Sequence, residues 1–214
     1  MSNVHYKMAL ALIKGGDNFF GHVVATFDLS ETSPKIFIDY KGRAIHSLRV
    51  NGVQVTEAGA FNKQRIFLPV ECQKEGANLV EILFESEYVS DCQEVQHFKD
   101  EQDGQEYIYS DLEPANCRNW FPCFDQPDLK ATQKFVCFVP ADWVIASNTS
   151  EESNSKVLSA EQAELFKLDA PAQAKMVEAF AGAEHYIVEF GTSKPMSTYI
   201  YNVTAGPFAI FHPK

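Results

Sequence analysis

The sequence predicts an all-β protein built from many short antiparallel strands. Runs rich in β-branched and aromatic residues follow one another from Tyr6 to Phe84, and turn signals such as Asn51-Gly52 separate them. Of the 214 residues, 45% are hydrophobic and 13% are aromatic, which is enough to bury a substantial core. Because no internal repeat or low-complexity linker divides the chain, we expect a single domain spanning residues 1–214.

The first half of the chain is expected to form a meander of antiparallel strands. The most strand-like runs are His22–Leu29, Lys35–Tyr40, Ile45–Val50 and Leu79–Phe84. Asn51-Gly52 lies between two of the β-like runs, and this dipeptide favours a type I′ turn because both of its residues accept positive φ angles. A tight hairpin is therefore predicted at this point.

The second half is less regular. The polar, turn-rich stretch from Glu87 to Glu106 is predicted to be an excursion between sheets. Near residues 150–184 the chain becomes rich in Ala, Glu, Ser and Lys, so we expect a polar insert. Pro171 and Gly182 bracket a plausible helical turn or two inside it. Strands are expected to resume at Tyr107 and at 132–139, 143–147, 186–190 and 196–211.

Charge and composition exclude several classes of function. Lys and Arg number 18 against 29 Asp and Glu, and this net charge of -11 disfavours nucleic acid as a partner. No run of 18 apolar residues predicts a membrane span, and the N-terminus does not resemble a signal peptide. The five cysteines contain no C-x-x-C pair, which favours reduced thiols and a cytoplasmic or other reducing intracellular compartment.

The run from Tyr107 to Ala131, YIYSDLEPANCRNWFPCFDQPDLKA, fits neither a helical nor a strand period. It is therefore expected to be a loop system fixed by specific packing. Arg118 and Asp125 are predicted to form an ion pair, or a pair bonded to the backbone, that fixes the loop. Cys117 and Cys123 are expected to stay reduced. The predicted structural corner comprises Arg118, Trp120, Phe121, Pro122, Asp125, Gln126 and Pro127.

This run closely resembles the end of the N-terminal β domain of zinc aminopeptidases of the aminopeptidase N type. Weaker likeness extends over nearly the whole chain, from Phe19-Phe20-Gly21-His22 through Val50-Asn51-Gly52 to Ala205-Gly206-Pro207-Phe208. The resemblance implies a saddle-shaped antiparallel β-sandwich, with the insert near 150–184 as the exception. It also implies that Glu113 occupies the position that reaches into the active site and holds the free α-amino group of a peptide.

The catalytic residues of that family are not found in this sequence. None of the six histidines has another histidine four residues away, so no helix here presents two imidazoles to one metal. The catalytic domain with its H-E-x-x-H helix is expected to follow this kind of domain, and the sequence stops before it. We therefore expect no catalytic residue, no metal ligand and no cofactor in these 214 residues, and zinc only in a separate catalytic domain.

Two functional interpretations remain open. In the first, the chain is a non-catalytic structural or interaction subunit of a larger assembly, with the insert near 150–184 as its own contact surface. In the second, it is the N-terminal portion of a zinc metallo-aminopeptidase that anchors the peptide α-amino group through Glu113. Both predict a protein partner, either subunits of a larger complex or a catalytic aminopeptidase domain. A carbohydrate- or lipid-binding function would rest on fold class alone.

Overall fold

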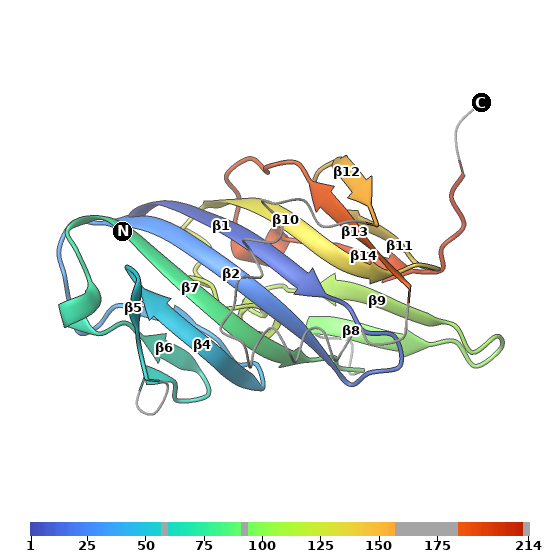
Figure 1. Ribbon diagram of the computed structural model, residues 1–214, viewed down its shortest axis with the longest axis horizontal. Coiled ribbons are helices and arrows are strands. Elements are labelled where there is room, and N and C mark those ends of the chain that lie inside the picture. Colours follow the sequence, from blue (N-terminus) through green and yellow to red (C-terminus); the bar gives the residue numbers. More distant parts are fainter. Residues whose placement is uncertain (57–59, 91–93, 157–183, 212–214) are drawn as a thin grey trace.

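The computed structural model describes residues 1–56, 60–90, 94–156 and 184–211. Within these ranges the chain is mostly β and forms three sheets (Figure 1). The largest has eight strands in the order β12-β13-β10-β1-β2-β7-β4-β5, the second has four in the order β11-β14-β9-β8, and the third pairs β3 with β6. The all-β prediction is confirmed.

The strands of the first half are β1 (Ser2–Ala11), β2 (Asn18–Leu29), β3 (Phe37–Asp39), β4 (Ala44–Val50), β5 (Val53–Gln54), β6 (Arg65–Phe67) and β7 (Gly76–Glu87). Those of the second half are β8 (Glu94–Lys99), β9 (Glu106–Asp111), β10 (Ala131–Pro140), β11 (Val144–Ser147), β12 (Glu151–Ser155), β13 (His185–Phe190) and β14 (Val203–Gly206). The short helical turns are η1 (Val70–Cys72), α2 (Cys117–Trp120) and η2 (Thr198–Ile200).

The predicted antiparallel meander is present in the order β1, β2, β7 and β4. Asn51 and Gly52 have φ angles of 51° and 82°, so the predicted hairpin turn is also confirmed. The prediction of purely antiparallel pairing is wrong at one place, because β1 and β10 run parallel from Val4 opposite Ala131 to Ala11 opposite Phe138. The chain returns to the large sheet only after the excursion through β8, β9 and α2, and such a long crossover permits parallel pairing.

Two strands lie where only polar connections were predicted. β8 falls within the predicted excursion and pairs with β9 along its whole length, from Glu94 opposite Asp111 to Lys99 opposite Glu106. β12 opens the predicted insert and pairs with β13. Both strands lie at sheet edges, where charged side chains are common because one side of the strand stays open to water. Their polar composition therefore hid them from the sequence pattern.

The last predicted strand, 196–211, is much shorter than expected. Only Val203–Gly206 forms a strand, and η2 precedes it. The side chains of Ser197 and Thr198 bond to the preceding loop, where they contact Pro127 O and Asp125 Oδ1, and this holds the chain away from the sheet. The helical turn predicted between Pro171 and Gly182 lies outside the described residues.

The main core lies between the eight-stranded sheet and the remaining elements, and aromatic side chains fill much of it. Tyr6 of β1 is fully buried and meets Phe121 and Tyr201 edge-on, with ring centroids 5.4 and 6.4 Å away. Its hydroxyl accepts a hydrogen bond from Phe124 N at 2.8 Å. The core thus joins the first strand directly to the loop system that follows β9.

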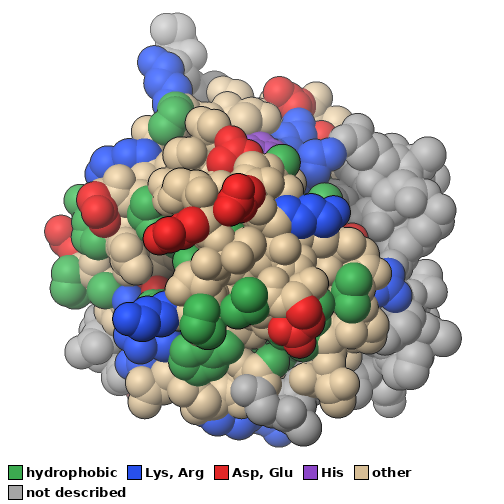
Figure 2. All heavy atoms as spheres, turned by 90° about the vertical axis from the view of Figure 1, so that its left-hand side faces the viewer, with side chains coloured by type: hydrophobic (Ala, Val, Ile, Leu, Met, Phe, Trp, Pro, Cys, Tyr) green, Lys and Arg blue, Asp and Glu red, His purple; other side chains and the backbone are tan. Residues whose placement is uncertain are grey.

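The surface is mixed in charge. At the end of the molecule seen in Figure 2, acidic and basic side chains are interspersed with small groups of hydrophobic ones. Among the described residues, no helix has both the length and the apolar character that crossing a membrane requires.

Candidate binding site beside the aromatic corner

The corner between β9 and β10 is held by a buried ionic cluster. Arg118 Nε lies 2.9 Å from Asp125 Oδ2, so the structure brings the predicted ion-pair partners together. The Arg118 backbone N–H also donates to Asp125 Oδ2, and Nη2 donates to the Asp125 carbonyl. Asp125 is 4% exposed, and its second carboxylate oxygen accepts from Thr198 Oγ1 at 2.8 Å. Each polar atom of this buried carboxylate therefore has a partner.

A second carboxylate extends the cluster. Arg118 Nη1 lies 3.4 Å from Asp39 Oδ1, and Arg65 Nε lies 3.7 Å from the same oxygen. Burial raises the pKa of Asp39, although Arg118 pulls it the other way. Burial alone would lower the pKa of Arg118, but the hydrogen bond to Asp125 and the charge of Asp39 outweigh it and raise the pKa. The Arg118 guanidinium therefore stays charged and forms ion pairs with both Asp39 and Asp125.

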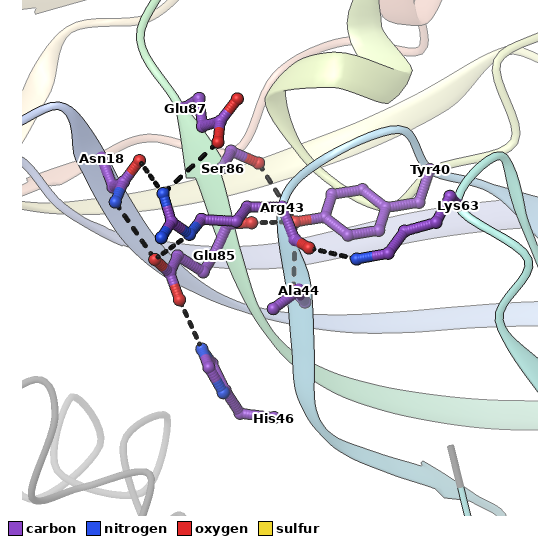
Figure 3. A network of polar contacts seen from close by, with 9 residues as sticks. All are labelled: Asn18, Tyr40, Arg43, Ala44, His46, Lys63, Glu85, Ser86 and Glu87. Atoms are coloured by element: carbon purple, nitrogen blue, oxygen red, sulfur yellow. Dashed lines mark hydrogen bonds and ion pairs between the residues drawn. The ribbon is translucent and has the colours of Figure 1, made fainter. Parts of the chain in front are cut away.

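The aromatic residues of the corner are packed into the core. Trp120 and Phe121 are fully buried with their rings edge to face, and Phe121 stacks on Tyr201 at a centroid distance of 6.2 Å. Ser86 Oγ donates to Trp120 O at 3.0 Å. Tyr40 Oη, which lies beside Ser86 in Figure 3, donates to Glu85 O at 2.6 Å. The corner is therefore attached to β7 by the hydrogen bond from the Ser86 side chain as well as by packing.

The remaining corner residues divide by burial. Pro122 is buried with the aromatic side chains, whereas Gln126 and Pro127 are exposed. Pro127 therefore does not pack into the core. Its role in the structure is polar, because its carbonyl accepts from Ser197 Oγ at 2.9 Å and from Lys130 Nζ at 2.6 Å. A proline carbonyl remains a full acceptor even though the residue lacks an N–H.

The loop also brings Cys117 and Cys123 together as free thiols. Their sulfur atoms and a carboxylate oxygen of Asp125 all lie within 4.8 Å of one another, which is the one grouping with metal-ligand geometry among the described residues. Burial raises the pKa of both thiols, so they stay protonated, and the carboxylate is already bound to Arg118. A cationic guanidinium beside the group disfavours a metal ion, and we interpret the three side chains as packing and hydrogen-bonding groups.

Glu113 lies on the turn that connects β9 to this corner. Leu112 is buried next to it, and the Glu113 carbonyl accepts a hydrogen bond from Asn116 Nδ2 at 3.1 Å. The peptide bond from Glu113 to Pro114 is cis. Its side chain is exposed, and within the described ranges no hydrogen bond or ion pair engages the carboxylate. The backbone is thus anchored while the charge stays available.

A recess of about 260 Å³ opens beside Glu113. The end of β9 forms one wall with Ser110 and Asp111, and the η2 region forms the other with Tyr199 and the exposed Ile200. The lining thus combines two acidic residues, Asp111 and Glu113, with the apolar residues Leu112 and Ile200. A cationic group of small size suits such a lining, since carboxylates form strong charge-assisted hydrogen bonds with ammonium donors.

Asp111 was missed by the sequence interpretation. The sequence carried no signal for it, because β9 ends at Asp111 and Glu113 lies on the following turn, so the strand period of two does not relate the two acids. The predicted substrate residue and this second acid both line the recess. Arg118, Trp120, Phe121 and Asp125 are not part of its lining.

The protein is thus an all-β domain in which the carboxylates of Asp111 and Glu113 line a surface recess next to a buried aromatic corner. The family model of the peptidase M1 N-terminal domain matches residues 2–172. The chain therefore belongs to this family, as an N-terminal domain of the M1 aminopeptidase type.

Comparison with individual proteins agrees with this assignment. The chain is 31% identical over 134 residues to aminopeptidase N of Streptomyces lividans, which covers 63% of this chain and 15% of that protein. It is 25% identical over 141 residues to leucine aminopeptidase 2-1 of Scheffersomyces stipitis, covering 64% and 22%. For glutamyl aminopeptidase of Mus musculus the identity is 24% over 168 residues, covering 72% and 18%. The chain thus matches less than a quarter of the length of these relatives.

Proposed function

We propose that this chain is the amino-terminus-binding domain of a zinc aminopeptidase. It supplies no catalytic group itself but packs against a catalytic domain, in the same or another polypeptide, which holds the zinc. Glu113 then binds the free α-amino group of the peptide substrate. The observation that carries the proposal is the exposed Glu113 carboxylate, without a partner in the described ranges, on a backbone turn anchored to the buried corner.

The electrostatics of the recess support this role. An ammonium group that enters a closed site loses its hydration, and an anionic partner offsets that cost. Asp111 adds a second negative charge to the lining, which raises the local concentration of cationic ligands. Three of the relatives carry the name aminopeptidase, and such enzymes act on peptides with a free amino terminus.

The test compares Glu113→Gln with Glu71→Gln, a matched change at an exposed glutamate on η1 far along the chain from the recess. Each tagged variant is purified gently from its source with its bound partners, and release of amino-terminal residues is assayed with zinc present and after chelation. We expect Glu113→Gln to lower kcat/KM by about 10- to 150-fold, the value of a hydrogen bond to a charged group. Zinc-dependent activity that survives Glu113→Gln unchanged would contradict the proposal.

A second candidate function is a structural or interaction subunit without peptidase activity. It is favoured by an aromatic strip on the four-stranded sheet, where the rings of Phe98 and Phe208 contact Tyr107 at 6.4 and 5.0 Å. Phe98, Phe208 and the neighbouring Tyr109 are each 40 to 52% exposed. Exposed aromatic side chains that pack together mark a surface for a protein partner. A stable assembly that contains neither zinc nor peptidase activity would support this function instead.

Both candidates share the remaining parts of the proposal. We infer a protein partner in either case, and a reducing intracellular compartment, because buried Cys117, Cys123 and Cys137 are free thiols. Measurement of the mass of the native assembly and of its thiol content checks both points in one preparation.

A further inference from the structure

A second hollow, of about 510 Å³, shares no lining residue with the recess beside Glu113 and is here called the cationic pocket. The charged and polar side chains that line it are Lys41, Arg43, Lys63, Glu87, Glu94 and Asn119. Three cations thus stand against two acids, on a chain whose net charge is -11. A local excess of positive charge on so acidic a protein favours a bound anion at this place.

The backbone of the connection between β3 and β4, which carries part of the pocket, is held against the buried corner. The Lys41 N–H donates to Arg118 O at 2.8 Å, which joins this connection to α2. Gly42 follows, and a Cβ atom there would lie 2.1 Å from Tyr40 Oη and 2.6 Å from Ser86 Oγ. Only glycine permits so close an approach. The backbone under the pocket is therefore fixed by the core.

The arginine of the pocket is already paired with acids. Arg43 Nη1 lies 3.4 Å from Glu87 Oε1, and Arg43 Nε lies 3.1 Å from Glu85 Oε1, as Figure 3 shows. Glu94, the second acid of the lining, is not free either. The positive charge that is not paired with an acid therefore belongs to the two lysines.

Lys41 and Lys63 both have N–H donors available for a ligand. The Lys41 side chain is exposed, and within the described ranges no ion pair or hydrogen bond engages its ammonium group. Lys63 Nζ donates to the carbonyl of Arg43 at 2.6 Å, which is a neutral acceptor (Figure 3). Because an ammonium group has three donors, Lys63 keeps donors for a ligand after this bond.

Asn119 on α2 adds an independent sign of a ligand. The residue is 9% exposed, yet among the described parts of the chain no hydrogen bond engages its side-chain amide. A polar group this buried ordinarily has a partner, because an unpaired one loses its hydration without compensation. Since Asn119 lines the pocket, a ligand held there reaches this amide.

We propose that the cationic pocket binds a phosphate group, with space beside it for a small organic body. A phosphomonoester carries about 1.5 to 2 negative charges at neutral pH, which matches two ammonium groups better than the single charge of a carboxylate does. Its oxygens accept hydrogen bonds from Lys41, Lys63 and the Asn119 amide. The volume lies within the range of small-molecule sites, about 300 to 1,000 Å³, and exceeds what a phosphate group alone fills.

Phosphate binding at this pocket is independent of the proposed function, because the pocket and the recess beside Glu113 are lined by different residues. Glu113→Gln should therefore bind phosphate as the wild type does. Failure of one idea leaves the other untouched.

An NMR titration of the full chain tests the class of ligand. Inorganic phosphate, glycerol phosphate and acetate are added at constant ionic strength, and the signals of the Gly42 N–H and the Asn119 side-chain amide are followed. We expect saturable shifts with both phosphates and a weaker response to acetate. Tighter binding of glycerol phosphate would identify an ester as the ligand and equal binding the free ion, and both results support the proposal. Shifts that do not saturate, or acetate that binds as tightly as phosphate, would overturn it.

Three variants locate the phosphate within the pocket. Lys41→Gln and Lys63→Gln should each raise the Kd for phosphate about 5-fold, the value of one exposed ion pair. The matched control is Lys35→Gln, at an exposed lysine that does not line the pocket, and it should leave the Kd unchanged. Asn119→Asp keeps the shape of the side chain but replaces a donor with a negative charge, so it should abolish binding. Because Lys41 is exposed, Lys41→Gln is expected to fold normally, and an unchanged Kd in that variant would refute the assignment.

Discussion

The corner and the recess in front of it use charged side chains in opposite ways. In the corner, Asp125 is buried and both of its carboxylate oxygens are bound, one by Arg118 and the other by Thr198. In the recess, Glu113 is exposed and its carboxylate has no partner within the described ranges. A satisfied buried charge fixes a shape, whereas an unsatisfied exposed charge remains free to bind. The comparison separates residues that stabilise the structure around the site from residues that are available to bind a ligand.

The largest expected loss of stability follows substitution of Arg118. Arg118→Met leaves the Asp125 carboxylate buried without its cation, and we expect the free energy of unfolding to fall by about 3 to 5 kcal/mol. Urea denaturation measures this loss. The control is Arg49→Met, which removes a hydrogen bond to Gln54 at the exposed hairpin and is expected to cost less than about 1 kcal/mol. Equal losses in the two variants would remove the distinction between corner and surface.

A smaller effect is expected at Thr198. Thr198→Val keeps the shape of this buried side chain but removes its hydrogen bond to Asp125 Oδ1. The expected loss is about 1.5 to 3 kcal/mol, because one oxygen of a buried charged group loses its donor. Thr204→Val is the matched control, since its hydroxyl donates to Asn202 Oδ1 at a long 3.4 Å. A Thr198→Val protein as stable as the wild type would mean that water replaces the hydroxyl.

The two buried thiols of the corner are expected to make the folded protein less stable at alkaline pH. Burial raises the pKa of Cys117 and Cys123, so the folded protein holds these protons more firmly than the unfolded chain does. Their contribution to stability is therefore complete below the ordinary thiol pKa of about 8.5 and is lost as pH rises above it. The free energy of unfolding then falls by at most about 1.4 kcal/mol per pH unit for each thiol.

The check is a series of urea denaturations between pH 7 and pH 10 (about the range in which thiols titrate) on the wild type and on Cys117→Ala with Cys123→Ala. We expect the double variant to show a shallower loss of stability. Cys72→Ala, at a half-buried thiol outside the corner, is the control for replacing a cysteine. An identical slope for all three proteins would show that folding does not raise the pKa of the corner thiols.

The smallest effect on stability is expected at the recess. Glu113→Gln and Asp111→Asn remove charges that are not bound to any described residue, so each should change the free energy of unfolding by less than about 0.5 kcal/mol. In an active assembly both variants should weaken kcat/KM, Glu113→Gln more than Asp111→Asn. A Glu113→Gln protein that loses as much stability as Arg118→Met would make Glu113 a structural residue and end the comparison.

Sequence patterns predicted the centre of the molecule better than its edges. The long runs of β2, β4, β7 and β10 alternate toward a core, so their period of two was readable. The edge strands β8 and β12 were missed, because an edge strand tolerates charge and therefore lacks that period. Within the site, Glu113 was predicted from a family resemblance, while Asp111 emerged only when the recess brought β9 and η2 together.

The sequence by itself determined the all-β class, the Asn51-Gly52 turn and the residues of the loop run from Tyr107 to Ala131, because these depend on local period and turn chemistry. Only the tertiary structure decided which charges are satisfied. Asp39 and Thr198 are distant in sequence from Arg118 and Asp125, yet both complete their cluster.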